Sequence, residues 1–138
     1  MIIDATNLTV GRLASFVAKK ALMGERVDIV NCEKAVITGN ARQIIENYKN
    51  KVKRGIPLQG PYYPKQADRI VRRAVRGMLP WKRQRGREAF KSVMCYMGVP
   101  GKFESQKMET VKGASIDKLP NLKYIQLKYI SKEVGRKI

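Results

Sequence analysis

Four arginines in the segment 67–78 have the spacing of a single helix face. Positions i, i+3, i+4 and i+7 fall on one side of an α-helix, and here they hold Arg69, Arg72, Arg73 and Arg76. The opposite side holds Ile70, Val71, Ala74, Val75 and Met78. Solvated helix faces usually pair both signs of charge, but Asp68 is the only acid in this segment. Guanidinium groups bind phosphate in bidentate fashion, so the pattern favours a phosphate-binding face over a merely solvated one.

A second group of basic residues surrounds the single tryptophan of the chain. The segment 81–87 contains Trp81, Gly86 and the cations Lys82, Arg83, Arg85 and Arg87. Arginine beside an aromatic ring and glycine is typical of segments that contact RNA backbone and unstacked bases. An equally good interpretation makes Trp81 a core residue with solvated charges around it. We also include three nearby cations among the candidate RNA contacts, namely Lys53, Arg54 and Lys91.

The charge of the chain predicts a polyanionic partner. Its 138 residues, 43% of them hydrophobic, suffice for one well-buried core. The 29 basic and 11 acidic residues give a formal net charge of +18, and a compact body with that charge repels itself unless a partner neutralises it. We therefore expect a nucleic acid to supply the negative charge.

A membrane surface is a poorer partner than a nucleic acid. A helix that binds in the membrane interface needs bulky Leu, Phe or Trp opposite its basic face, and the arginine segment has none of these there. No apolar run approaches the roughly 18 residues of a membrane-spanning helix. Asp4 and Arg12 argue against a secretory signal. We expect a cytoplasmic protein without membrane contacts.

Strand-like and helix-like segments alternate along the chain, which predicts an α/β domain with a mostly parallel sheet. Short apolar runs indicate strands at 1–4, 27–30, 35–38 and 93–97. Apolar residues at the helical period indicate helices at about 10–22, 41–53, 67–78 and 88–92. Three prolines and two glycines mark 55–64 as a loop between two of these helices.

The C-terminal part of the chain has a looser pattern. Residues 101–118 show neither hydrophobic period, which indicates an extended polar arm, while 124–127 resembles a strand and 129–134 a short helix. We assign residues 1–100 to an α/β RNA-binding core domain and 101–138 to a C-terminal extension packed on or beside it.

Residues suited to catalysis or metal binding are scarce. The chain has no histidine, which excludes Ser-His, Cys-His and His-metal sites. Cys32 and Cys95 lack the spacing of a metal or redox motif, so buried free thiols are expected. We predict a protein that is not an enzyme and that needs no cofactor, no metal and no small-molecule substrate.

Three stretches resemble the family of large-subunit ribosomal protein thirteen, in its archaeal form. They are Asp4-Ala5-Thr6-Asn7-Leu8-Thr9-Val10-Gly11-Arg12-Leu13-Ala14, then Val30-Asn31-Cys32-Glu33-Lys34-Ala35-Val36-Ile37-Thr38-Gly39-Asn40, and then Ala74-Val75-Arg76-Gly77-Met78-Leu79-Pro80. Their order and spacing agree with the family over about residues 2–100. Residues 101–138 depart from the bacterial pattern.

The resemblance implies both a fold and a partner. It implies a three-layer α/β/α domain around a small, mainly parallel sheet, with a basic loop and an extended C-terminal arm. It implies binding to large-subunit ribosomal RNA during and after assembly, beside neighbouring ribosomal proteins. The main RNA-facing surface carries over to 69–91, and Arg12 and Lys34 match further family positions.

Three hypotheses for function follow. The preferred one is a structural component that neutralises phosphates where folded RNA helices meet. An enzyme acting on nucleic acid is the alternative, but it requires clustered carboxylates for metal or a Gly-rich pocket, and the sequence shows neither. A free regulator that binds messenger RNA with the same basic face is the third.

Overall fold

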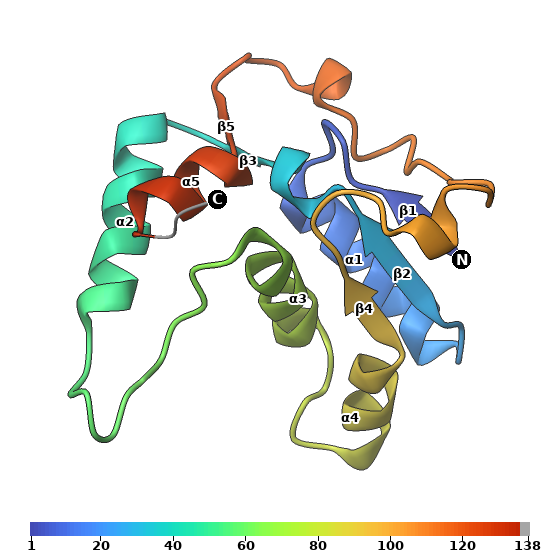
Figure 1. Cartoon of the computed structure of the whole chain (residues 1–138), viewed down its shortest axis with the longest axis horizontal. Coiled ribbons are helices and arrows are strands. Elements are labelled where there is room, and N and C mark those ends of the chain that lie inside the picture. The colour runs from blue at the N-terminus through green and yellow to red at the C-terminus, as the bar shows by residue number, and fades with distance from the viewer. Residues whose placement is uncertain (136–138) are drawn as a thin grey trace.

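The computed structural model describes residues 1–135, and its elements alternate along the chain as the sequence predicts (Figure 1). The strands are β1 (Ile2–Asp4), β2 (Val27–Val30), β3 (Val36–Thr38), β4 (Val93–Cys95) and β5 (Tyr124–Gln126). The helices are α1 (Val10–Leu22), α2 (Ala41–Lys53), α3 (Ala67–Met78), α4 (Gln84–Lys91) and α5 (Leu127–Glu133). Three short 3-10 turns complete the elements: η1 (Cys32–Lys34), η2 (Gly101–Phe103) and η3 (Ile116–Lys118).

A three-stranded parallel sheet in the order β1-β2-β4 forms the centre of the fold. Ile3 lies opposite Ile29, and Ile29 lies opposite Cys95. Parallel neighbours need long crossover connections. Here the β1–β2 connection contains α1, and the β2–β4 connection contains α2, α3 and α4. A second, two-stranded sheet pairs β3 with β5 in antiparallel orientation. The predicted α/β class and mainly parallel sheet are confirmed.

The two faces of the parallel sheet are covered differently. Ile3, Ile29 and Val93 face the main core, which α1 and α3 complete with buried residues such as Leu13 and Val75. Both crossovers run in the same direction across the sheet, so right-handed connections place both helices on this face. Figure 1 shows α3 in the middle of the molecule, between the sheet and the pair α2 and α5.

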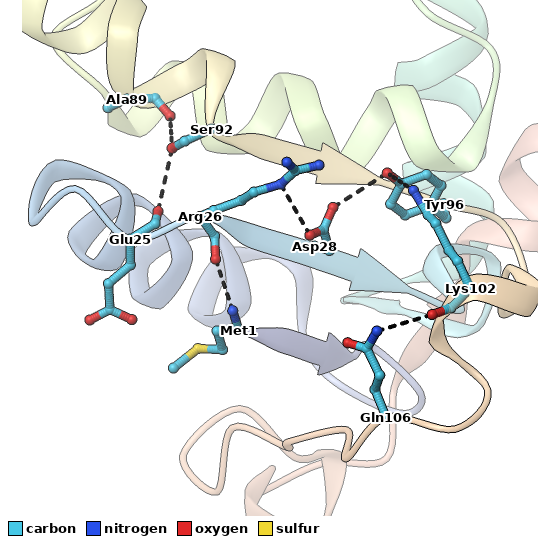
Figure 2. Close-up of polar contacts among 9 residues, drawn as sticks. All are labelled: Met1, Glu25, Arg26, Asp28, Ala89, Ser92, Tyr96, Lys102 and Gln106. Atoms are coloured by element: carbon cyan, nitrogen blue, oxygen red, sulfur yellow. Dashed lines mark hydrogen bonds and ion pairs between the residues drawn. The ribbon is translucent and has the colours of Figure 1, made fainter.

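The C-terminal arm covers the second face of the sheet. Ile2 and Val30 pack there against the buried ring of Phe103 in η2. The Lys102 ammonium donates a hydrogen bond to the Tyr96 hydroxyl at 3.0 Å (Figure 2). It also lies 4.6 Å from the ring centres of Tyr96 and Phe103. This outer layer thus consists of a 3-10 turn and irregular chain, where the resemblance implied helices.

The arm is better anchored than its composition suggests. Backbone hydrogen bonds join Asp4 N to Glu109 O and Glu109 N to Ile2 O, both at 2.9 Å, so the arm follows the edge of β1. Further along, Ala114 is fully buried. The extended arm therefore packs on the core through isolated buried residues such as Phe103 and Ala114, which produce no hydrophobic period in the sequence.

Two further expectations need correction. The basic segment 81–87 is not one loop, since α4 begins at Gln84, four residues before the predicted start. Met78 was expected on the packed side of α3, but it is 43% exposed and accepts a hydrogen bond from the Ser15 hydroxyl at its sulfur, at 3.2 Å. It sits in the last turn of the helix, where the chain leaves the core.

A polar junction joins the first two family-like stretches in the fold. The Asp4 carboxylate accepts hydrogen bonds from the Thr6 amide (3.0 Å), the Thr6 hydroxyl (2.6 Å) and the Asn31 amide group (3.0 Å). Asn31 has a left-handed backbone (φ 55°), which asparagine tolerates well. Burial raises the pKa of Asp4, but these hydrogen bonds and the charge of Lys34 outweigh it and hold the pKa below its ordinary value of 3.8.

Replacing Asp4 with Asn should therefore have a pH-dependent effect on stability. A lowered pKa in the folded state stabilises the protein above the unfolded pKa, and this contribution is lost as the pH falls through the folded pKa. Asn can accept the same hydrogen bonds without charge, so we expect Asp4→Asn to lower the free energy of unfolding at pH 7 by roughly 1 kcal/mol or less. Urea titrations at several pH values measure this difference, which should shrink below about pH 4. A pH-independent difference would contradict the charge argument.

The start of α4 packs directly on the turn that carries Trp81. Arg83 N donates to Pro80 O at 2.9 Å, and Gly86 N donates to Arg83 O at 3.1 Å. Gly86 is buried, and a Cβ atom there would overlap the carbonyl oxygen of Pro80. Glycine at this position therefore allows the turn 80–83 to lie against the first turn of α4.

We expect Gly86→Ala to destabilise the protein by about 2 kcal/mol and to move Trp81, because backbone at Pro80 must shift. Thermal unfolding and the fluorescence of the single tryptophan measure the two effects. Gly77→Ala is the matched control, since this exposed glycine of α3 has open space around its Cβ position. That control should stabilise the protein by about 0.5–1 kcal/mol. Equal behaviour of the two variants would show that the close approach at Pro80 is unimportant.

Candidate nucleic-acid interface

Helix α3 presents its four arginines away from the core. Its buried residues are Ala67, Ile70, Val71 and Val75, and they pack mainly against α1 and β4. Arg69, Arg73 and Arg76 are exposed, whereas Arg72 is half-buried. Since the apolar face is held in the core, the direction of the arginine face is set by the packing of the helix. We call the four arginines together with this exposed face the arginine stripe.

Three of the four guanidiniums stack on aromatic rings from other segments. The guanidinium carbon of Arg72 lies 4.6 Å from the ring centre of Phe90. The guanidinium carbon of Arg73 lies 4.7 Å from the ring centre of Tyr63, and that of Arg76 lies 4.8 Å from the ring centre of Trp81. Cation–π contacts of this kind favour one orientation of the guanidinium over others. The rings belong to the loop before α3, the turn after it and α4, so tertiary structure supplies them.

The aromatic residues beside the stripe form two pairs. Trp81 and Phe90 meet edge to face at 5.0 Å, and Tyr48 and Tyr63 at 5.9 Å. Burial, together with the neighbouring Tyr63 phenol, raises the pKa of Tyr48 to about 12. Trp81 is 37% exposed, and it is neither a buried core residue nor a free ring. Sequence analysis missed Tyr63 and Phe90, since their spacing to the arginines has no helical period.

The positive charge of the stripe is not neutralised within residues 1–135. Ion pairs in this part of the chain join Lys20 to Glu25, Arg26 to Asp28 and Lys49 to Glu133. In the same part of the chain, the buried Arg72 Nε and the Asp68 carboxylate oxygen Oδ1 have no hydrogen-bond partner. The exposed guanidiniums of Arg69, Arg73 and Arg76 are therefore available to an anion from outside.

Two hollows connect the stripe with other predicted contacts. A shallow one of about 230 Å³ lies along the stripe and is lined by Tyr62, Pro64, Arg69, Arg72, Arg73, Arg76 and Phe90. A larger one of about 700 Å³ lies between the end of α2, the loop 55–64 and the start of α3. Lys53, Arg54 and Arg69 all line it. The fold thus brings the predicted residues Lys53 and Arg54 next to the stripe.

The predicted residues after α3 fall into two groups. Lys82, Arg83 and Lys91 are exposed. The other two are held by backbone carbonyls: Arg85 donates to Leu22 O at 3.4 Å, and Arg87 to Trp81 O at 3.4 Å and Lys82 O at 3.3 Å. Arg85 thus lies at the C-terminal end of α1, and Arg87 stabilises the turn that carries Trp81.

Arg12 and Lys34 lie in other parts of the fold. Arg12 Nη1 donates to the Gly113 carbonyl in the arm at 3.1 Å. Lys34 is the exposed last residue of η1, near the Asp4 junction. Neither contributes to the lining of the two hollows beside the stripe.

The cysteines and acidic residues offer no reactive thiol or metal site among the described residues. Cys32 is fully buried and Cys95 partly so, and both are free thiols. A hydrogen bond with Cys95 and burial raise the pKa of Cys32, which keeps it protonated. Across residues 1–135 no three acidic, cysteine or histidine side chains are grouped as metal ligands. In the same range no helix is both long enough and apolar enough to cross a membrane.

Comparison with known proteins identifies the family. The model of the family described as ribosomal protein L13 matches residues 1–102. The large ribosomal subunit protein uL13 of Methanopyrus kandleri is 48% identical over 97% of this chain and 86% of its own length. The uL13 protein of Haloarcula marismortui is 47% identical over 98% of this chain and 90% of its own length. The uL13 protein of Archaeoglobus fulgidus is 44% identical over 97% of this chain and 86% of its own length. The resemblance of the three sequence stretches is confirmed, and the chain belongs to the ribosomal protein L13 family.

Proposed function

We propose that this protein is a structural constituent of the large ribosomal subunit that binds ribosomal RNA and supports subunit assembly. Its partners are large-subunit ribosomal RNA and neighbouring ribosomal proteins in the cytoplasmic ribosome. The family match and relatives named large ribosomal subunit protein uL13 support this role. The role is structural and involves no catalysis, cofactor or small-molecule substrate.

The arginine stripe is the observation that carries the proposal. Residues 69–76 extend over roughly 10 Å of helix, which is enough to contact more than one phosphate. Stacking on Tyr63, Trp81 and Phe90 holds three guanidiniums in place before RNA arrives. Binding then loses less side-chain entropy than it would with freely rotating arginines.

The surroundings of the stripe suggest how the other predicted residues contribute. Lys53 and Arg54 extend the positive surface along the larger hollow. Lys82, Arg83 and Lys91 are free to contact phosphates beyond Trp81. Arg85 and Arg87 combine such contacts with backbone hydrogen bonds, and Arg12 and Lys34 would serve a separate RNA segment near the arm.

The isolated protein should bind structured ribosomal RNA with an affinity that falls steeply as salt rises. Each neutralised phosphate releases condensed counterions and contributes about 0.9 or less to the slope of log K against log salt. We expect a slope equivalent to about six or more contacts, given the charge of +18. Filter binding or fluorescence anisotropy over a salt series measures it. A flat response would remove the electrostatic basis of the proposal.

Replacing Arg69, Arg72, Arg73 and Arg76 together by Gln should keep the fold and weaken RNA binding. The apolar face of α3 is unchanged, so only the stacking contacts are lost, and the salt slope should fall by up to about 0.9 per arginine. Sucrose-gradient sedimentation should find the variant depleted from large subunits. The wild type should sediment with them, and a largely free wild-type pool would contradict the proposed function.

A matched variant separates position from net charge. Lys107, Lys112, Lys118 and Lys123 are exposed residues of the C-terminal extension, and changing all four to Gln removes the same charge. If the stripe is the main contact, this control binds RNA more tightly than the arginine variant. Equal losses in both variants would mean that net charge, rather than the stripe, determines binding.

A further inference from the structure

The larger hollow beside the stripe has the chemistry of a nucleotide site. Its volume of about 700 Å³ lies within the range of roughly 300–1,000 Å³ that is usual for ligand sites. Its lining includes the cations Lys53, Arg54, Lys65 and Arg69, and none of its lining residues among 1–135 is acidic. The lining also includes the apolar and aromatic residues Ile56, Pro57, Pro61, Tyr62, Tyr63 and Pro64. The cations suit a phosphate group and the flat apolar surface suits a base, so the hollow fits a nucleotide better than a bare phosphate.

Tyr62 is the ring that is free to receive a base. It is 71% exposed, and its hydroxyl donates to the Pro57 carbonyl. A Cβ at Gly60 would come within 3.1–3.2 Å of the ring, so the ring lies against the loop backbone. Tyr63 differs, because its ring already contacts Tyr48 and Arg73. The hydroxyl contact and the loop backbone therefore fix the orientation of the Tyr62 ring, while the ring stays accessible to a ligand.

The loop that carries Tyr62 is closed before any ligand binds. Ile56 N donates to Gly60 O at 3.3 Å, and Gly60 N donates to Ile56 O at 2.8 Å. At the neck, Gly55 has φ +96°, and a Cβ there would overlap the Gly60 carbonyl. A preformed loop loses little entropy on binding, which suits a site that holds a ligand in one place.

The hollow continues into the stripe. Tyr62, Pro64 and Arg69 line both hollows, so a strand whose phosphates follow the arginines would pass the mouth of the larger one. A base in a duplex is stacked and cannot enter, whereas loop or bulge nucleotides can turn outward.

We infer that this hollow receives one unpaired nucleotide of the bound RNA, whose base stacks on Tyr62 while Lys53, Arg54 and Arg69 hold its phosphates. This inference rests on the proposed RNA binding and adds an unpaired nucleotide to it. Stacking alone tolerates any base, so the site selects an unpaired nucleotide without selecting a particular base.

Two RNA probes with the same number of phosphates test the inference. One is a hairpin with a loop of unpaired adenosines, and the other is a fully paired duplex. We expect Tyr62→Leu to weaken binding of the hairpin roughly tenfold, the loss typical for one stacked base, and to leave duplex binding unchanged. Anisotropy titrations with the full-length protein measure both affinities, with circular dichroism as the check on folding.

Two control variants on the same loop sharpen the test. Tyr62→Phe keeps the ring and loses only the hydroxyl, so its hairpin affinity should stay near that of the wild type. Leu58 is 92% exposed and does not line the hollow, so Leu58→Ala should change neither affinity.

Several results would overturn the inference while leaving RNA binding intact. These are an unchanged hairpin affinity in Tyr62→Leu, equal losses on hairpin and duplex, or a loss in Tyr62→Phe as large as in Tyr62→Leu. A wild type that binds neither these probes nor structured ribosomal RNA would overturn the proposed function itself, and this inference with it.

Discussion

The burial of one face of α3 is the constraint on which the candidate interface depends. Val71 and Val75 are fully buried, and the helix packs against α1, β4 and α5. When the apolar residues of a 12-residue helix are held in a core, the opposite face has no freedom to turn inward. The arginines must therefore point outward, and their repulsion is tolerated because solvent or an anion reaches them.

Aromatic rings then turn an exposed basic face into an organised one. Arg72, Arg73 and Arg76 each lie over a ring contributed by a different segment. Long arginine side chains normally lose considerable rotamer entropy when they are fixed. Stacking restricts them in the free protein, so the anion meets donors that are already oriented. Arg72 is the half-buried arginine of the stripe, and its Nε has no hydrogen-bond partner within residues 1–135.

The fold uses its two sheet faces for different tasks. The face toward α1 and α3 contains the main core, while the other face is closed by Phe103 and the Lys102–Tyr96 contact of the arm. The arm also pairs with β1 near the Asp4 junction. The C-terminal segments thus complete the same body: Leu127 and Ile130 of α5 are buried in the main core.

The sequence by itself determined the elements with strong local signals. Helical periods placed α1, α2 and α3, and short β-branched runs placed β2, because period and turn residues are properties of neighbouring positions. The grouping of the four arginines on one helix face followed from the same period, and the family followed from three motifs. The sequence could not show that α4 begins at Gln84 or that the arm is anchored by Phe103 and Ala114.

Only the tertiary structure decided which distant residues complete the candidate interface. Tyr63, Trp81 and Phe90 meet the arginines through chain reversals, and Lys53 and Arg54 approach Arg69 across the loop 55–64. The strand order, which places both crossover helices on one face, likewise depends on long-range pairing. Such contacts join residues without any fixed sequence spacing, so no local pattern encodes them, and the packing of the whole chain selects them.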